Sequence, residues 1–311
     1  MKKLFPPIAI LGATSQLAKD FIQQAHKSFQ PDFRLYARSP EKIILFQQKE
    51  NLHYPAFALD QFGEEKYSAI INFIGVGDPV RAKTMGADIF DVTLDMDQKV
   101  LAYLAKNIST TYIFMSSGAV YGTDYLQPVN KNTASYVPIN HLQPQNYYSI
   151  AKLYAEARHR ALPQHNIFDI RIFNYISRTL DLNTRFLITD MINAIRNKTT
   201  FETDSQEILR DFLHPSDFCH LIQACLNTPK NMPIDAYSKA PISKMALLET
   251  LRDHFDLKYR LVDSINAVNA TGRKPFYYSE NRDASQIGYT PQYDSLRGIL
   301  EEVGVILNQV Q

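Results

Sequence analysis

Short apolar runs alternate with amphipathic stretches through the first half of the chain. The runs that are short and apolar enough for buried strands are residues 8–12, 33–37, 53–60, 68–75, 111–117 and 168–174. The stretches between them in which apolar residues recur with helical spacing are residues 17–29, 39–50, 83–106 and 146–162. Strands that alternate with helices in this way predict βαβ units, which build an α/β fold with a doubly wound parallel sheet.

The second half of the chain is less regular. After about residue 174, proline, asparagine and threonine are scattered among short helical stretches. The sequence shows no linker, repeat or charge block that would mark an independent domain. This half therefore predicts a smaller mixed C-terminal region that is built onto the sheet.

Charge and composition exclude several classes of protein. The 311 residues carry a formal net charge of +1, without the basic excess that nucleic-acid and membrane surfaces need. No apolar stretch approaches the ~18 residues of a membrane span, and two prolines interrupt the apolar run that a signal peptide would require. Cys219 and Cys225 are too few for a disulfide framework. We therefore expect a cytoplasmic protein with reduced cysteines that binds neither nucleic acid nor membrane.

The segment GATSQLA (12–18) joins the first predicted strand to the first predicted helix. A doubly wound sheet places the phosphates of a dinucleotide at this turn, because the free N–H groups at the helix start attract an anion. The candidate cofactor contacts in the turn are Gly12, which permits a tight bend, and Thr14, Ser15, Gln16 and Leu17. A plain strand–turn–helix connection would explain the same residues equally well.

The end of the second predicted strand bears on the choice of coenzyme. Enzymes that prefer NAD usually carry an acidic residue there, but this strand runs FRLYARS and has none. Arg38 lies within reach, and a guanidinium matches the oxygens of a 2′-phosphate. We therefore expect NADP, with NAD as the alternative if Arg38 is only a surface residue. Asp60, at the end of the third predicted strand, is a further candidate cofactor contact.

Candidate catalytic residues follow at the fifth strand and the next helix. Tyr148 and Lys152 stand four residues apart, so their side chains share one helix face. A carbonyl that accepts hydride needs a proton donor, and we expect the Lys152 ammonium to lower the pKa of Tyr148 from its usual value of about 10. Ser117 ends the strand upstream, where its hydroxyl can reach both the substrate and the phenol. The Tyr–Lys spacing also occurs by chance, and Tyr147 is a competing candidate.

Taken in order, SSGAVYG (116–122) after an apolar strand and YSIAK (148–152) in the next helix resemble the extended short-chain dehydrogenase/reductase family. The segments RIFNYIS (171–177), LRDFLHPSD (209–217) and IGYTPQYDSLRGI (287–299) continue the resemblance, which runs from about residue 8 to residue 300. The chain departs from the family at the phosphate turn, where Ser15 and Ala18 stand in place of glycines.

The resemblance implies a fold, an oligomeric state and a biological process. The fold is a Rossmann-type NAD(P)-binding domain with a smaller substrate-binding region. The first comprises residues 1–173 and 211–240, and the second comprises residues 174–210 and 241–311. The family also implies a homodimer and a place in surface polysaccharide synthesis.

The same resemblance assigns roles to individual residues. It makes Ser117, Tyr148 and Lys152 catalytic, and it implies that the substrate is a nucleotide-linked sugar. The residues that it places on this substrate are Asn174, Arg210 and Arg273, with Arg210 at the diphosphate.

The reaction can be narrowed from the residues that follow Ser117. Family dehydratases carry an Asp–Glu pair there, whereas this chain has Gly118 and Ala119, which cannot transfer a proton. A ketoreductase or an epimerase remains. Arg38 indicates NADPH and so favours the ketoreductase; the alternative is an epimerase with tightly bound NAD. A non-catalytic NADP-sensing regulator is a third hypothesis, but the presence of all three catalytic residues argues against it.

Several other residues are better explained by structural roles than by functional ones. The eight histidines lack metal-ligand spacing, so we predict no metal site. The resemblance makes Asp211 and His214 structural. The segment FYYS (276–279) is either a stacking platform for a base or, as we expect, part of a packed interior or interface.

Overall fold

The computed structural model describes residues 6–77, 79–122, 124–263 and 274–308. These residues form a parallel sheet of seven strands in the order β11-β6-β5-β4-β1-β2-β3. The strands are β1 (Ile8–Leu11), β2 (Phe33–Ala37), β3 (Ala56–Ala58), β4 (Ala69–Asn72), β5 (Thr111–Ser117), β6 (Ile167–Ile172) and β11 (Met232–Asp235). The predicted doubly wound α/β sheet is thereby confirmed. The strand order reverses beside β1, and ligands of such sheets bind at the carboxyl ends of the strands at this point.

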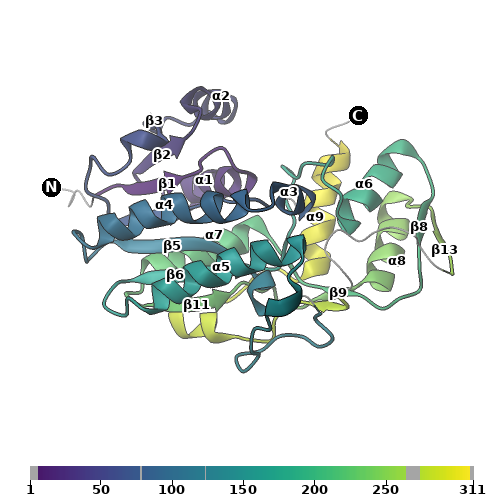
Figure 1. Ribbon diagram of the computed structural model, residues 1–311. Helices are drawn as coiled ribbons and strands as arrows, with labels where there is room; N and C mark the ends of the chain where they lie inside the picture. Colours follow the sequence, from purple (N-terminus) through teal and green to yellow (C-terminus); the bar gives the residue numbers. More distant parts are fainter. Residues whose placement is uncertain (1–5, 78, 123, 264–273, 309–311) are drawn as a thin grey trace.

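Helices cover both faces of the sheet, and the strands are apolar on both sides as a result. In β5, Ile113 and Met115 join the cluster of α1 (Gln16–Ser28), α2 (Pro40–Glu50) and α7 (Pro215–Leu226). Tyr112 and Phe114 point the other way, toward α4 (Asp88–Leu104) and α5 (Pro144–Arg160). Figure 1 shows α4 and α5 across the near face of the sheet and α7 behind it.

A second apolar cluster lies to the right of the sheet in Figure 1. It is formed by α6 (Leu187–Asn197), α8 (Lys244–Phe255) and α9 (Ser295–Asn308), beside the parallel pair β8 (Phe201–Thr203) and β13 (Tyr259–Leu261). Two short sheets complete the region. One pairs β7 (Asn174–Tyr175) with β10 (Phe212–Leu213), and the other orders β12 (Ile242–Ser243), β9 (Leu209–Arg210) and β14 (Phe276–Tyr277). The small mixed region predicted for the C-terminal half is therefore present.

The boundaries of several predicted elements were wrong. The helix predicted over residues 83–106 is two helices, α3 (Pro79–Met85) and α4, because Gly86 adopts a left-handed conformation with φ +57° between them. The strand predicted over residues 53–60 is only β3, and a 3₁₀ turn, η1 (Leu59–Gln61), follows it. Strand β11, at the edge of the seven-stranded sheet, was not predicted. The helices α6 to α9 are longer than the short helices expected after residue 174.

A buried charged network joins α4, α5 and β6. The imidazole of His159 is fully buried between two carboxylates, with Nδ1 2.6 Å from Asp169 and Nε2 2.8 Å from Asp97. Arg158 and Arg160 add ion pairs to these same carboxylates from the partly exposed side. Burial alone would lower the pKa of His159, but the two carboxylates raise it to about 9. The ring is therefore an imidazolium at neutral pH.

The structure also bears on the expected state of the cysteines and on the expected absence of a membrane span. Cys219 and Cys225 are free and buried in α7, as expected for reduced core residues. Within the described ranges, no helix combines the length and the apolar character that crossing a membrane requires.

Candidate active site

The turn after β1 is shaped for a close approach of the chain to a ligand. Gly12 has φ +74°, and a Cβ added there would lie 3.0 Å from Cγ1 of Ile74 and 3.1 Å from the main chain of residues 73 and 74. Only glycine fits this position without displacing the start of the segment after β4. Ser15 caps α1 by accepting a hydrogen bond from the N–H of Ala18 at 3.3 Å.

The same turn holds a polar group without a partner. The side-chain nitrogen of Gln16 is buried, and no described residue accepts a hydrogen bond from it. A buried donor of this kind needs an acceptor, and a dinucleotide pyrophosphate at the start of α1 would supply one. Thr14 and Leu17 lie in the same turn and are partly exposed. The residues of the turn therefore fit a bound dinucleotide.

Arg38 and Asp60 lie at the same edge of the sheet. Strands β2 and β3 pair in parallel with Ala37 opposite Ala58, and Arg38 directly follows β2. Asp60 is in η1, directly after β3, and both side chains are exposed. Both residues are therefore accessible near the expected position of the adenosine ribose.

Ser117 and Tyr148 meet at the carboxyl end of β5. Ser117 is the last residue of β5 and begins the 3₁₀ turn η2 (Gly118–Tyr121), where its Oγ accepts from the N–H of Ala119 at 3.1 Å. The phenol of Tyr148 lies close enough to Ser117 for the serine hydroxyl to lower the pKa of the phenol. The ring of Tyr147 instead lies 6.0 Å from that of Phe90 in α4. Tyr148 is therefore the tyrosine that faces the serine.

Lys152 is buried one helical turn beyond Tyr148. Its Nζ donates to the carbonyl of Met115 at 2.7 Å and lies 4.3 Å from the ring centroid of Phe114. Burial lowers the pKa of Lys152 to about 8, although Asp97, Asp169 and Glu156 oppose the shift.

The expected lowering of the Tyr148 pKa is not seen. Burial raises the pKa of Tyr148, and the hydrogen bond with Ser117 offsets this only in part. The physical reason is that the Lys152 ammonium is directed to the main chain of β5. That expectation was wrong for the structure described.

The space around Gly118 bears on the reaction. A Cβ added to Gly118 would lie 2.5 Å from the ring of Phe173, and the hydroxyl of Tyr125 donates to the Gly118 carbonyl. An acidic side chain at position 118 would therefore displace the aromatic ring. The absence of the dehydratase acid has a steric basis as well as a chemical one.

Two cations lie beside the ring of Tyr277, whose hydroxyl is 3.4 Å from the Ser117 Oγ. The guanidinium of Arg210 donates to the carbonyl oxygens of Leu209 and Lys274 at 2.8 and 2.6 Å and lies 5.9 Å from the ring centroid of Tyr277. The Nζ of Lys274 lies 4.5 Å from the same centroid. Burial lowers the pKa of Arg210 to about 10, and burial and repulsion by Arg210 lower that of Lys274 to about 8. Two adjacent cations of this kind attract an anion.

The other two predicted substrate contacts have different outcomes. The amide nitrogen of Asn174 donates to the carbonyl oxygens of Asp211 and Tyr277, at 3.1 and 3.3 Å. The hydrogen bond to Tyr277 connects Asn174 to strand β14. The contact of Asn174 with a substrate stays a prediction. Arg273 lies outside the described residues.

Comparison with known proteins identifies the family. The sequence profile described as "NAD dependent epimerase/dehydratase family" matches residues 10–238. The chain belongs to this family. No curated protein matches the sequence.

Solved structures share the fold at low sequence identity. A UDP-N-acetylglucosamine 4-epimerase from Methanobrevibacter ruminantium M1 has a TM-score of 0.78 and 14% identity, with 98% of this chain and 99% of that chain covered. A UDP-glucose-4-epimerase from Stenotrophomonas maltophila, solved with NAD, has a TM-score of 0.80 and 12% identity, with 98% of each chain covered. A dTDP-glucose 4,6-dehydratase from Bacillus anthracis, also with NAD, has a TM-score of 0.75 and 15% identity, with 98% and 97% covered.

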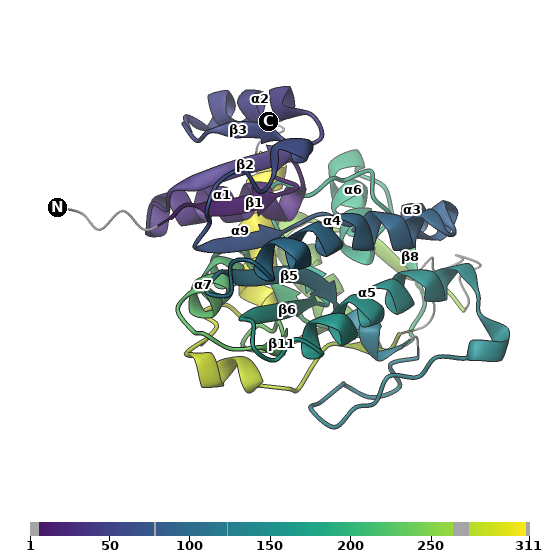
Figure 2. The same cartoon turned by 60° about the vertical axis from the view of Figure 1, so that its left-hand side comes forward.

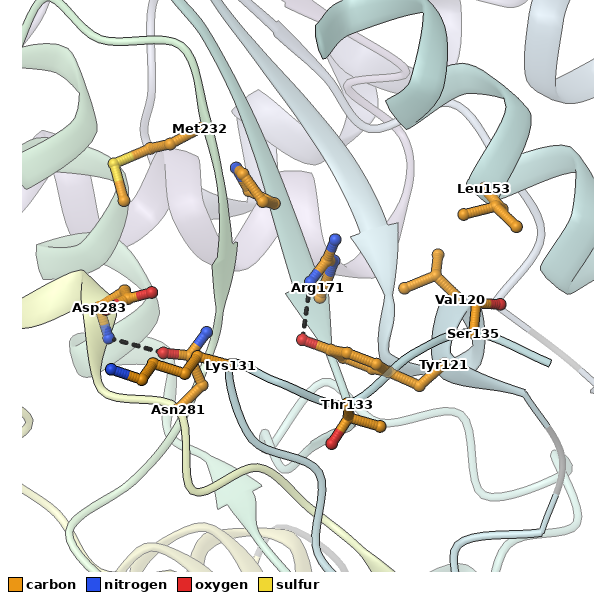
Figure 3. A pocket seen from close by; sticks show the side chains of 11 residues that line it. Val120, Tyr121, Lys131, Thr133, Ser135, Leu153, Arg171, Met232, Asn281 and Asp283 are labelled. Atoms are coloured by element: carbon orange, nitrogen blue, oxygen red, sulfur yellow. Dashed lines mark hydrogen bonds between the residues drawn. The ribbon is translucent and has the colours of Figure 1, made fainter.

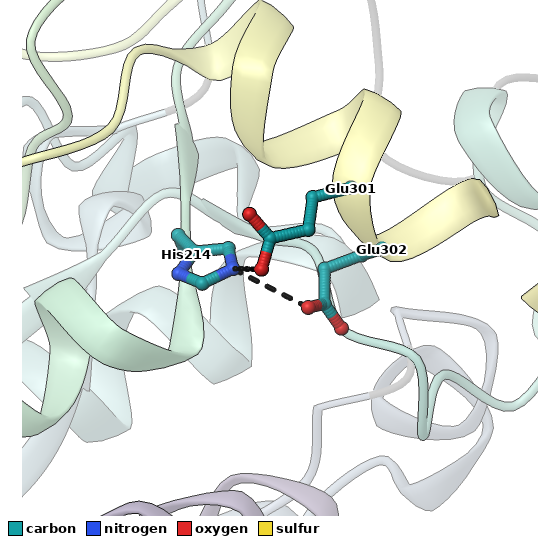
Figure 4. A group of neighbouring side chains, drawn as sticks. All are labelled: His214, Glu301 and Glu302. Carbon is teal, nitrogen blue, oxygen red and sulfur yellow. Dashed lines mark hydrogen bonds and ion pairs between the residues drawn. The ribbon is translucent and has the colours of Figure 1, made fainter. Parts of the chain in front are cut away.

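Asp211 and His214, which the family pattern makes structural, bind other parts of the protein. The Asp211 carboxylate accepts from the N–H of Ser238 and from the hydroxyl of Ser295. His214 lies beside Glu301 and Glu302 of α9 (Figure 4). Arg178 supplies a cation to this group, and although burial would raise the pKa of Glu302, hydrogen bonds from His214 and Arg178 lower it to about 2. The cluster therefore functions as an ion-pair network between β10 and α9.

A groove of about 410 Å³ borders η2 and β6, and none of Ser117, Tyr148 and Lys152 lines it. It is lined on one side by Val120 and Tyr121 of η2 and by Arg171 of β6, as Figure 3 shows. The Arg171 guanidinium forms ion pairs with Glu156 and Asp235 and donates to the hydroxyl of Tyr121. The charge of Arg171 is therefore already matched by these two carboxylates.

No single motif of the sequence indicated Lys274. The sequence singled out Arg273 on its resemblance to a family arginine, whereas the described cation next to Arg210 is the following residue. The signal available was the Arg–Lys pair directly before the aromatic segment FYYS. That segment reaches the site through Tyr277, a placement that the sequence did not indicate.

Proposed function

We propose that the protein is a nucleotide-sugar epimerase that uses a retained NAD. The observation that carries the proposal is the meeting of Ser117 and Tyr148 at the carboxyl end of β5, with Lys152 behind them and the paired cations Arg210 and Lys274 beside Tyr277. The family membership and the epimerases among the structural relatives support it. The proposal departs from the ketoreductase favoured by the sequence, because these comparisons fit the epimerase alternative better.

The residues of this chain would divide the chemistry as follows. A bound NAD would supply reversible hydride transfer at one sugar carbon, which allows that carbon to be inverted. Tyr148 takes the proton from the hydroxyl on that carbon and later gives it back, and Ser117 hydrogen-bonds the same oxygen. Lys152 would hold the nicotinamide ribose, and its charge favours the phenolate when the ammonium turns toward Tyr148. Arg210 and Lys274 would bind the diphosphate of the nucleotide.

The decisive experiment uses the protein as purified. Extraction followed by mass spectrometry is expected to release NAD, and UDP-glucose, UDP-N-acetylglucosamine or dTDP-glucose is expected to be inverted at one carbon without added coenzyme. A protein that carries no coenzyme and turns over a keto-sugar nucleotide only when NADPH is supplied would favour the ketoreductase. Cofactor binding without turnover on either class of substrate would favour the non-catalytic regulator.

The ketoreductase remains the second candidate because Arg38 is exposed at the end of β2, where the strand FRLYA has no acid. If NADP is the coenzyme, Arg38→Ala is expected to weaken NADPH binding at least about tenfold, the size of one charge-assisted contact, and to leave NADH binding nearly unchanged. Fluorescence titration of both coenzymes measures this. Lys42→Ala, in the neighbouring helix α2, is the matched control. Equal losses for NADPH and NADH would remove Arg38 from coenzyme selection.

Arg210→Ala is expected to weaken nucleotide-sugar binding about ten- to a hundredfold, because a charge-assisted hydrogen bond is lost. Coenzyme binding should stay near normal, since Arg210 lies on the substrate side. Calorimetric titration with UDP-glucose and with NAD measures both. Arg210→Lys keeps the charge and should lose less, while Arg297→Ala, which removes another arginine stacked on a tyrosine, should change neither. An equal loss for both ligands would assign Arg210 to the wrong cleft.

The remaining proposals concern context. We propose that the protein acts in the cytoplasm as a homodimer, on a substrate destined for surface polysaccharides. Residues 1–173 with 211–240 would bind the coenzyme, and residues 174–210 with 241–311 would bind the sugar. Light scattering of the purified protein tests the dimer.

A further inference from the structure

Ser117 has two phenol neighbours, of which the proposed mechanism uses one. Besides Tyr148, the hydroxyl of Tyr277 lies 3.4 Å from the Ser117 Oγ. The Tyr277 hydroxyl also accepts a hydrogen bond from the N–H of Ala119, and the nearby Tyr148 raises the pKa of Tyr277. A second phenol therefore stands at the oxygen-binding end of the site, on a chain segment about 130 residues away from Tyr148.

Two phenols compete for the hydrogen-bonding capacity that Ser117 has left. A serine hydroxyl has one proton to donate and two lone pairs that accept. The N–H of Ala119 occupies one lone pair, which leaves one donated and one accepted hydrogen bond. Tyr148 and Tyr277 are the phenols that face these two places. A ligand oxygen that binds Ser117 therefore competes with a phenol for one of them.

Tyr277 is the phenol that we expect to give way to a ligand oxygen. Its contact with Ser117 is 3.4 Å, beyond the usual length of an O–H···O hydrogen bond, whereas Tyr148 is needed as the proton carrier. Once released, the Tyr277 hydroxyl needs another acceptor, because buried hydroxyls are almost always hydrogen-bonded. The oxygen that displaced it is the nearest candidate.

The position of Tyr277 is fixed on several sides. Strand β14 pairs with β9, so that Tyr277 lies opposite Arg210 in the register. The ring centroid of Tyr277 lies 4.7 Å from that of Tyr125 and 5.2 Å from that of Phe173. The ammonium of Lys274 covers its face at 4.5 Å. A tyrosine held in this way can shift by the small distance that a ligand oxygen requires, but its hydroxyl stays at the site.

We propose that Tyr277 is a further catalytic residue, whose hydroxyl donates a hydrogen bond to the same sugar oxygen that Ser117 and Tyr148 bind. The inference rests on the proposed function. Tyr277 remains a donor across the working range of pH, because burial raises its pKa to about 12. It would stabilise the negative charge that develops on the oxygen as the proton moves to or from Tyr148.

The test compares Tyr277→Phe with the wild type on UDP-glucose, and on UDP-N-acetylglucosamine or dTDP-glucose if one of these is the sugar inverted. Removing one donor to the reacting oxygen is expected to lower kcat about 10- to 100-fold and to leave KM within about threefold. The Kd for UDP alone, the Kd for NAD and the melting temperature should not change. Tyr278→Phe is the matched control, since Tyr278 is buried next in the chain and its hydroxyl has no hydrogen bond to the described residues.

Three results would overturn the role of Tyr277. The first is a kcat within twofold of the wild type, and the second is an equal fall in Tyr278→Phe. The third is a loss confined to KM or to UDP binding, which would make Tyr277 a positioning residue for the nucleotide. A wild type that inverts none of these sugars is a different failure: it removes the proposed epimerase, and the role of Tyr277 falls with it.

Discussion

Tyr148→Phe is expected to keep the fold and the coenzyme and to lose at least about 100-fold in turnover, the low end of general acid–base catalysis. The reason is specific to one hydroxyl. Tyr148 is the phenol that hydrogen-bonds Ser117 beside the expected position of the nicotinamide, and phenylalanine preserves its ring packing. Steady-state kinetics on the sugar that the wild type inverts give the loss, and a thermal melt checks the fold.

Tyr147→Phe is the matched control for this experiment. Its ring packs against Phe90 in α4, so loss of its hydroxyl should change turnover much less. Wild-type turnover in Tyr148→Phe would remove Tyr148 from the mechanism. An equal loss in both variants would mean that the stretch acts through packing and not through proton transfer.

His159→Gln is expected to lower the free energy of unfolding by about 3–5 kcal/mol at pH 7, because it removes the cation between two buried carboxylates. The expected pH dependence follows from the raised pKa of His159. The stabilisation is fully present below the ordinary pKa of 6.5 and is lost as the pH rises through about 9. The difference between wild type and variant should therefore be large at pH 7 and smaller at pH 10.

Urea unfolding at the two pH values measures this difference. His254→Gln is the control, since His254 is exposed on α8 and should change stability by less than about 0.5 kcal/mol. A His159→Gln loss that is the same at pH 7 and pH 10 would show that the imidazolium is not the stabilising species. Arg158 and Arg160 keep partial charge balance in the variant, which makes folding of the variant feasible.

The sequence by itself determined the features that depend on neighbouring residues. Apolar runs that alternate with helical stretches are sufficient to predict the parallel sheet, because both periods are local. The pairing of Tyr148 and Lys152 on one helix face, the end of β5 at Ser117 and the glycine at the phosphate turn are likewise local. The family resemblance then ordered these motifs along the chain, and the sequence profile confirmed the family.

Other features depended on chain segments that meet only in the folded protein. The break at Gly86 was missed because apolar spacing continues through it, whereas its backbone conformation ends α3. The direction of the Lys152 ammonium depends on the Met115 carbonyl, which belongs to another element. Burial, and not charge, therefore governs the pKa of Tyr148, and no local pattern encodes burial.

The candidate site shows the same division. Sequence spacing placed Ser117 near Tyr148, since the strand and the following helix are consecutive elements of one βαβ unit. Tyr277 and Lys274 reach the same place only because β14 pairs with β9 beside the sheet, about 67 residues away in the chain. Contacts between segments so far apart follow from tertiary pairing and not from the period of a sequence. The pairing of Ser117 with Tyr148 was thus determined by the sequence, whereas the tertiary structure decided which aromatic and cationic side chains surround it.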